Sequence, residues 1–184
     1  MEKVITTDRL ILRPFTLSDA ASVRALVGNW KVASMLARVS YPYGQDLAEQ
    51  WIASHPQTRA QGSHIPFAIE KDGALVGCVG LDREDDSDAY EVGYWVGEPY
   101  WNQGIATEAA RAAVTHAFTA LKSKDGSPVT RLTAGHMAEN HASGQVLTKL
   151  GFRYTAETDV WSEARRAKVH ALRMVLKRTN GQNK

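Results

Sequence analysis

The stretch of residues 91–118, "EVGYWVGEPYWNQGIATEAARAAVTHAF", begins with a strand-like pattern and ends as an alanine-rich helix. At the change lie Gln103, Gly104, Ile105, Ala106 and Thr107, and backbone amides at a helix N-terminus have no partner within the helix. Together with the positive end of the helix dipole, such amides attract phosphate groups. Gly104 lets the backbone approach an anion closely, and the hydroxyl of Thr107 adds a donor. The pattern predicts either an anion cradle or a simple turn.

Composition limits the class of protein. The chain has 184 residues, of which 43% are hydrophobic and 23% charged, as in a soluble globular domain. The net charge of +2 and the scattered Lys and Arg argue against a nucleic-acid partner. No apolar run is long enough to span a membrane, and no signal peptide is evident. The single Cys78 lies in a strand-like run and is expected to be a buried, inert thiol. We therefore expect one cytoplasmic domain with no membrane partner and no metal site.

The rest of the chain alternates between strand and helix patterns. Residues 8–14 predict a strand, Ser18 and Asp19 begin a helix, and Asp46 begins another with a capping box to Glu49. Residues 63–81 predict a hairpin that turns at Asp72-Gly73. The full order is β-α-α-β-β-β-α-β-α-β-β, with Gly151 ending the last helix and an antiparallel strand pair after it. We expect a single domain over residues 6–178 and a polar tail over residues 179–184.

Three segments carry a resemblance to a known family: "TDRLILRPFTLSDA", "YEVGYWVGEPYWNQGIATEA" and "NHASGQVLTKLGF". Over residues 6–177 the chain resembles the GCN5-related N-acetyltransferase (GNAT) superfamily, and within it the ribosomal-protein-alanine (RimJ/RimL-like) branch. The resemblance implies an α/β (α+β) fold. Its central sheet would be mixed but mostly antiparallel, with about seven strands flanked by about four helices. A splayed V would separate the fourth and fifth strands.

The resemblance also implies acetyl-CoA as cosubstrate, with its pyrophosphate on the amides of residues 103–107. The superfamily pattern begins with Gln or Arg where this chain has Trp101, so the amides must carry more of the binding. Gly93 and Gly97 predict a bulge or a close backbone approach in the preceding strand. The pantetheine arm would lie along Tyr94, Trp95 and Val96, and an amide near Trp95 or Val96 would form an oxyanion hole. Asn140 would bind the pantetheine amides, although Asn here is also a standard helix N-cap.

Glu91 is the candidate general base, because it shares a strand face with Gly93 and Trp95. The alternative for Glu91 is a solvated edge charge near Asp85, Asp86 and Asp88. His136 is the substitute base, although a histidine with satisfied hydrogen bonds is the commoner case. Where many superfamily members carry a proton-donating Tyr, this chain has Leu147. The branch instead implies Ser143 as proton donor, with helix capping as the alternative.

The function implied is acetyl transfer to a primary amine by direct attack, with the α-amine of a protein N-terminus, such as that of a ribosomal protein, as acceptor. Three alternatives stay open: a small amine (polyamine, amino acid or antibiotic) as acceptor, a different acyl group, and a non-catalytic acyl-CoA sensor. The acidic residues 82–88 suit either a cationic acceptor or a solvated turn. The pattern allows a monomer or a homodimer.

Overall fold

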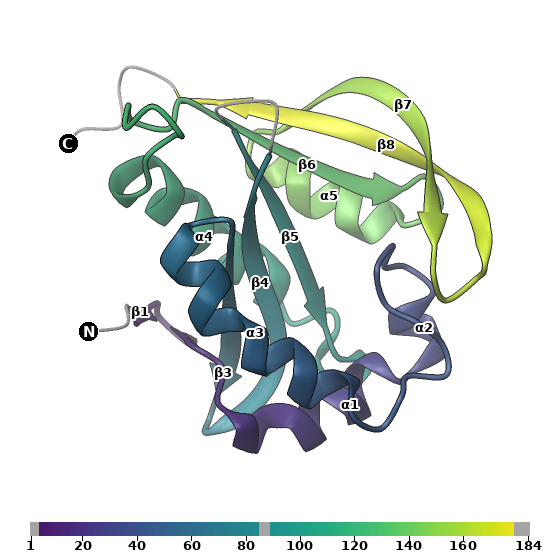
Figure 1. Cartoon of the computed structure of the whole chain (residues 1–184). Coiled ribbons are helices and arrows are strands. Elements are labelled where there is room, and N and C mark those ends of the chain that lie inside the picture. Colours follow the sequence, from purple (N-terminus) through teal and green to yellow (C-terminus); the bar gives the residue numbers. More distant parts are fainter. Residues whose placement is uncertain (1–3, 85–88, 179–184) are drawn as a thin grey trace.

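The computed structural model describes residues 4–84 and 89–178, and in these ranges one eight-stranded sheet is flanked by five α-helices (Figure 1). The sheet order is β1-β2-β3-β4-β5-β6-β8-β7, mostly antiparallel, so the predicted fold class is confirmed. The strands are β1 (Ile5–Thr6), β2 (Ile11–Arg13), β3 (His64–Lys71), β4 (Ala74–Arg83), β5 (Tyr90–Val96), β6 (Arg131–Met137), β7 (Arg153–Ser162) and β8 (Ala167–Lys177). The helices are α1 (Ala20–Val27), α2 (Trp30–Ala33), α3 (Leu47–Gln61), α4 (Ile105–Ala120) and α5 (His141–Lys149), with 3-10 turns at Leu17–Asp19 and Glu98–Tyr100.

Three local predictions were wrong. The strand expected over residues 8–14 forms only over β2, because the hydroxyl of Thr7 accepts the amide of Leu10 at 3.0 Å and closes a turn between β1 and β2. The one-turn helix α2 was not expected, and Asn29 caps it by accepting the amide of Lys31 at 2.9 Å. The side chain of Asp46 makes no capping hydrogen bond to α3, so the capping box with Glu49 does not form.

The predicted turns are present. Asp72 and Gly73 have φ angles of 52° and 78°, as a tight hairpin between β3 and β4 requires. Gly151 has a φ of 93° directly after α5, and β7 and β8 form the expected antiparallel pair. The predicted polar tail over residues 179–184 lies outside the described residues.

The V in the sheet lies between β5 and β6, the fourth and fifth of the predicted strands. These parallel strands pair only at Tyr90 with Leu132 and at Glu91 with Thr133, and then diverge (Figure 1). The predicted V is therefore confirmed. No bulge accompanies it, because β4 and β5 stay in register along their whole length. Gly97 instead allows a close approach, since a Cβ there would lie 2.4 Å from Cδ2 of Leu26.

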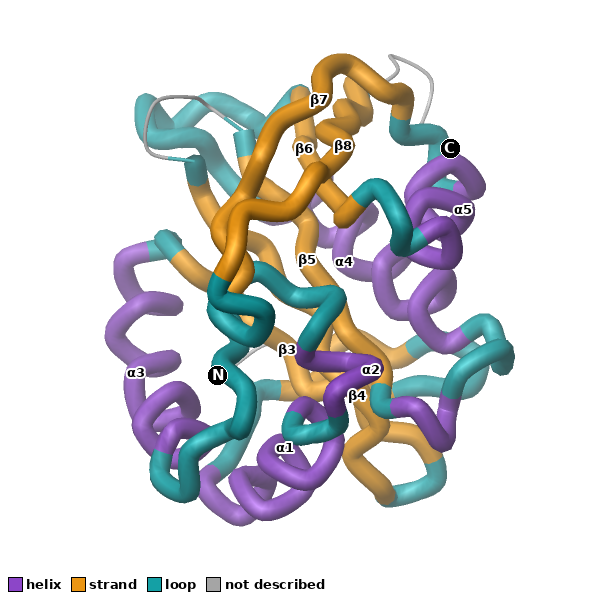
Figure 2. Tube along the Cα trace, turned by 90° about the vertical axis from the view of Figure 1, so that its right-hand side faces the viewer, coloured by secondary structure: helices purple, strands orange, loops and turns teal. Residues whose placement is uncertain are grey.

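Helices cover both faces of the sheet. Helices α1 and α3 pack on one face and α4 and α5 on the other, and Figure 2 shows α3 and α5 on opposite sides of the strands. Small residues bring α4 close to β4 and β5, where its alanines 109, 113 and 117 are fully buried. The predicted close contact between the alanine-rich helix and the sheet is confirmed.

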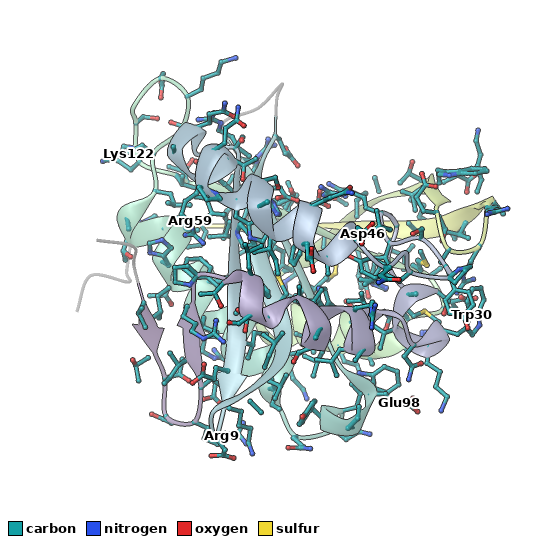
Figure 3. All side chains as sticks on the ribbon, turned by 60° about the horizontal axis from the view of Figure 1, so that its bottom comes forward. Arg9, Trp30, Asp46, Arg59, Glu98 and Lys122 are labelled. Carbon is teal, nitrogen blue, oxygen red and sulfur yellow. The ribbon has the colours of Figure 1, made fainter. Side chains whose placement is uncertain are left out.

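Two contacts fix α2 at the open end of the V. Glu98 accepts the side-chain amide of Asn29 at 2.6 Å and forms an ion pair with Lys31. Figure 3 places Trp30 and Glu98 at one end of the molecule and Lys122 at the other. The tip of the β7–β8 hairpin contacts the segment after α2, where Glu163 donates its amide to Ala37 O at 2.9 Å. The segment after α2 is thus held between β5 and the hairpin.

Candidate active site

A cleft of about 1480 Å³ opens where β5 and β6 diverge. Its wall contains every residue that the sequence nominated for catalysis or cofactor binding: Glu91, Tyr94, Trp95, Val96, Gln103, Gly104, Ile105, Ala106, Thr107, Asn140 and Ser143. Residues from β5, the start of α4 and the start of α5 meet there because all three elements border the V.

The start of α4 presents free backbone donors to the cleft. The first hydrogen bond within the helix runs from the amide of Glu108 to Gly104 O at 3.1 Å. The amides of Ile105, Ala106 and Thr107 precede it and have no carbonyl one turn back. Gly104 holds a left-handed φ of 77°, which a residue with a side chain adopts at a cost. Free amides at the N-terminus of a helix are suited to binding an anion.

Two side chains hold this cradle in place. Arg9 donates to Gln103 O at 3.0 Å and forms an ion pair with Glu108 at 2.7 Å, which joins the loop before α4 to the first turn of the helix. Trp101, which stands where the superfamily has Gln or Arg, donates its indole N–H to Val96 O at 2.6 Å and ties the loop to β5. No role for Arg9 was predicted, because its partners lie about a hundred positions away in the chain.

The amides of β5 divide between its two neighbours. Gly97 donates to Val76 O on β4 at 2.9 Å, and hydrogen bonding alternates along an antiparallel strand. The amide of Trp95 therefore faces β4, whereas those of Tyr94 and Val96 face the V. Of the two amides expected for the oxyanion hole, only that of Val96 has the required direction.

A hydroxyl pair lies at the side of the V that α5 covers. The Tyr94 hydroxyl lies 2.9 Å from Oγ of Ser143 and donates to Ser143 O at 3.1 Å. Burial raises the pKa of Tyr94 to about 12, so the phenol is protonated at neutral pH. Asn140 caps α5 by accepting the amide of Ser143 at 3.2 Å, which leaves its NH₂ group as a donor. The predicted N-cap at Asn140 is confirmed, and Leu147 is a core residue with 1% exposure.

Glu91 lies on the opposite face of β5. Its carboxylate accepts a hydrogen bond from Arg173 on β8 at 2.5 Å, so it is not the solvated edge charge of the alternative. Arg173 has room because Gly135 stands opposite it in the β6–β8 register, and a Cβ there would lie 3.0 Å from the guanidinium. Nothing in the sequence pointed to this partner, since it depends on the register of two distant strands.

A family model described as an acetyltransferase (GNAT) domain matches residues 9–153. The chain belongs to the GNAT family. This N-acetyltransferase is 27% identical over 159 residues to YoaA, an uncharacterised N-acetyltransferase of Bacillus subtilis, and the match covers 83% of this chain and 84% of YoaA.

Among solved structures, the GNAT chain matches RimL, a ribosomal-protein α-N-acetyltransferase bound to coenzyme A, with a TM-score of 0.80 at 18% identity. That match covers 95% of this chain and 98% of RimL. RimJ of Mycobacterium smegmatis, in complex with CoA-disulfide, matches with a TM-score of 0.78 at 21% identity, over 95% of this chain and 84% of RimJ. These neighbours have the fold expected for the RimJ/RimL-like branch.

Two other nominated side chains of the GNAT domain have structural roles. His136 is 7% exposed, and its ring nitrogens contact Met137 O at 2.8 Å and the Tyr154 hydroxyl at 3.2 Å. It is therefore a histidine with satisfied hydrogen bonds. Cys78 is buried, and burial raises the pKa of its thiol, so the expected inert thiol is confirmed. The described residues contain no cluster of three metal-ligating side chains, and none of their helices is long and apolar enough to cross a membrane.

The position of one acidic residue of this acetyltransferase differs from the expectation. Asp82 lies in β4 and not in an acidic loop, and it stands directly opposite Glu91 in the β4–β5 register. It accepts a hydrogen bond from Arg38 at 2.7 Å and contacts the imidazole of His64. Burial opposes ionisation of Asp82, but His64 and Arg38 outweigh it and lower its pKa. Of the other acidic residues expected here, Asp85, Asp86 and Asp88 lie outside the described residues.

Proposed function

We propose that this enzyme transfers an acetyl group from acetyl-CoA to the α-amine of a protein N-terminus, such as that of a ribosomal protein, by direct attack. One observation carries the proposal: a single cleft joins the free amides of α4 to the carboxylate of Glu91. The RimL and RimJ neighbours, which were solved with coenzyme A or its disulfide, support the choice of cosubstrate. The cytoplasm is the compartment in which such acceptors are made.

One set of groups in the cleft binds the cosubstrate, and a second set transfers protons. Bound acetyl-CoA supplies the activated acetyl group. The amides of residues 103–107 hold its pyrophosphate, and Asn140 together with the open edge of β5 along Tyr94, Trp95 and Val96 holds the pantetheine arm. The amide of Val96 stabilises negative charge on the carbonyl oxygen. Glu91 takes a proton from the acceptor amine. Ser143, bonded to Tyr94, gives its hydroxyl proton to the departing sulfur and regains one from solvent.

Two features favour an α-amine over a lysine side chain or a small amine. An α-amine has a pKa of about 7.7–8.0 and a lysine amine one of about 10.4, so far more of the α-amine is neutral at pH 7. Less proton abstraction is therefore required of Glu91, whose carboxylate already binds Arg173. The cleft of about 1480 Å³ also exceeds the range of about 300–1,000 Å³ that is common for small-ligand pockets. It has room for the cosubstrate and the end of a peptide.

Release of CoA thiol from acetyl-CoA tests the proposal against a panel of acceptors. The panel contains peptides with a free α-amine, N-blocked lysine peptides, polyamines, amino acids and aminoglycosides. We expect turnover with the free-N-terminus peptides alone. Turnover confined to the small amines would remove the protein acceptor and keep the chemistry. Tight acetyl-CoA binding without turnover on any acceptor would identify a sensor.

A further inference from the structure

Three titratable side chains form a row across the sheet on the face that α1 and α3 cover. His64 on β3 stands opposite Asp82 on β4, and Asp82 stands opposite Glu91 on β5. Side chains of directly opposed residues lie on the same face of a sheet. All three residues line the cleft.

At the next position on this face, β4 and β5 have no side chains, whereas β3 carries Pro66. Gly80 stands opposite Gly93, both line the cleft, and a Cβ on Gly93 would have no atom within 4 Å. A Cβ on Gly80 would lie 3.7 Å from Cε1 of His64, so the imidazole lies beside this glycine floor. An acceptor chain on the floor would thus have Glu91 and His64 as neighbours.

The contact with Asp82 orients the imidazole. Asp82 is an acceptor only when ionised, so the Nδ1 that contacts it carries the hydrogen and Nε2 has the free lone pair. The side chain of His64 is 26% exposed, and among the described residues Nε2 has no hydrogen-bond partner. This arrangement, a carboxylate on one ring nitrogen and an open second nitrogen, is that of proton-transfer histidines.

Acetylation of an ammonium group releases one proton per turnover. If Glu91 takes that proton, it must give it up before the next cycle. Arg173 cannot accept it, because a guanidinium stays protonated in proteins. Building on the function proposed above, we propose that His64, oriented by Asp82, takes this proton from Glu91 and releases it to solvent.

The transfer balances without another reactant. The proton passes from the carboxyl of Glu91, through water, to the lone pair on Nε2 of His64. The imidazolium that forms keeps its Nδ1 hydrogen on Asp82 and then loses the Nε2 proton to bulk water. Glu91 returns to the carboxylate, and no bond other than O–H and N–H bonds changes in this relay.

Of the titratable groups near Glu91, His64 is the one suited to exchange this proton with solvent, because its charged and titratable neighbours keep a fixed charge in the same pH range. From α3, His55 and Trp51 face its ring, with centroids at 5.8 Å and 6.5 Å. Burial, together with the charges of His64 and Arg59, lowers the pKa of His55 to about 4, so His55 stays neutral above pH 5. Asp82 and Arg38 stay charged, and imidazole is the side chain whose charge changes between pH 5 and 8.

The test compares His64→Ala with His170→Ala. His170 is a matched control, because it also contacts a carboxylate, Glu157 at 3.1 Å, but lies on the exposed β7–β8 hairpin. We expect His64→Ala to lower kcat by about 10²-fold, the usual size of a general acid–base contribution. Its pH–rate profile should change shape, because the imidazole no longer exchanges a proton, and added imidazole should restore turnover. His170→Ala should match wild type in all three measurements. A His64→Ala enzyme whose turnover imidazole does not restore, or whose pH profile keeps its shape, would overturn the relay.

A second measurement needs no acceptor. The ¹⁵N NMR shifts of the His64 ring report its tautomer in wild type and in Asp82→Asn, and loss of the anionic partner should reduce the form with hydrogen on Nδ1. An unchanged tautomer would show that Asp82 does not orient the ring. If wild type acetylates no amine on the panel, the proposed function fails. If wild type is active and His64→Ala behaves like His170→Ala, only the relay fails.

Discussion

Among single side chains, Glu91 carries the largest expected effect on chemistry. Glu91→Gln keeps a hydrogen-bond acceptor for Arg173 but cannot take a proton from the amine. We expect acetylation to fall by about 10²–10⁴-fold, the usual contribution of a positioned base. Steady-state rates and calorimetric binding of acetyl-CoA would measure the two quantities, and the affinity should stay the same. Glu157→Gln, at an exposed carboxylate outside the cleft, is the control and should act as wild type. Unchanged turnover in Glu91→Gln would remove Glu91 from the mechanism.

Ser143 offers a second test at the same scale. Ser143→Ala removes Oγ, but the Tyr94 hydroxyl keeps its 3.1 Å bond to Ser143 O, so no buried donor is left without a partner. We expect unfolding stability within about 1 kcal/mol of wild type and kcat lower by about 10²-fold. Urea unfolding and turnover would be measured on the same preparation. A loss of acetyl-CoA affinity with kcat intact would instead make Ser143 a binding residue.

At the scale of one element, the N-terminus of α4 can be tested through its glycine. Gly104→Ala places a Cβ on a backbone with φ 77° and within 3.3 Å of Arg9. The left-handed conformation costs roughly 1–2 kcal/mol for a residue with a side chain, so the cradle should distort and the Kd for acetyl-CoA should rise about tenfold. Gly126→Ala is a matched control, because Gly126 has φ 84° but does not line the cleft. It should lose similar stability without a change in Kd. Equal Kd values for the two variants would argue against the cradle.

The elements also explain what could be predicted from the sequence. The glycine start of α4, the Asp72-Gly73 turn and the cap at Asn140 are local, so neighbouring residues were enough to find them. Arg173, His64 and Arg38 reach the cleft only through strand register and a loop path, which no short pattern encodes. Asp46 shows the opposite error: the local pattern of a capping box was present, but the side chain makes no such bond.

At the scale of the whole molecule, the cleft depends on parts far apart in the chain. Divergence of β5 from β6 opens it, and α2 with the β7–β8 hairpin borders it. Arg165 strengthens that border by donating to Ser34 O at 2.8 Å and pairing with Glu139, and both partners line the cleft. Substitution of Arg165 can therefore change acceptor binding without touching the N-terminus of α4.

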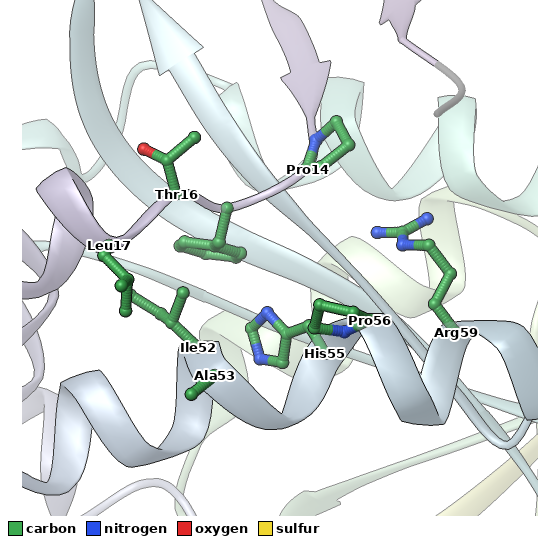
Figure 4. Close-up of a pocket in the computed structure, with 9 residues that line it drawn as sticks. Pro14, Thr16, Leu17, Ile52, Ala53, His55, Pro56 and Arg59 are labelled. Carbon is green, nitrogen blue, oxygen red and sulfur yellow. The ribbon is translucent and has the colours of Figure 1, made fainter. Parts of the chain in front are cut away.

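The stability of the whole domain should depend on His55. Its imidazole projects from α3 toward the segment that carries Pro14 and Thr16, beside a cavity of about 210 Å³ (Figure 4). His55 is 5% exposed, and neither ring nitrogen has a hydrogen-bond partner among the described residues. Burial, with the charges of His64 and Arg59, lowers its pKa from 6.5 to about 4.

Between pH 6.5 and 4, His55 is therefore protonated in the unfolded chain but neutral in the folded chain. The free energy of unfolding should fall as the pH drops through this range. At about 1.4 kcal/mol per pKa unit, the loss from this group is at most about 3.5 kcal/mol. Urea unfolding at pH 7 and pH 4.5 would measure it in wild type and in His55→Leu, which should lose about 2 kcal/mol less than wild type over that interval. The acid losses of Asp19 and Asp82, whose pKa values are lowered, occur at still lower pH and are common to both proteins. His170→Leu, at an exposed site, should follow wild type, and an equal pH dependence in all three proteins would exclude His55 as the source.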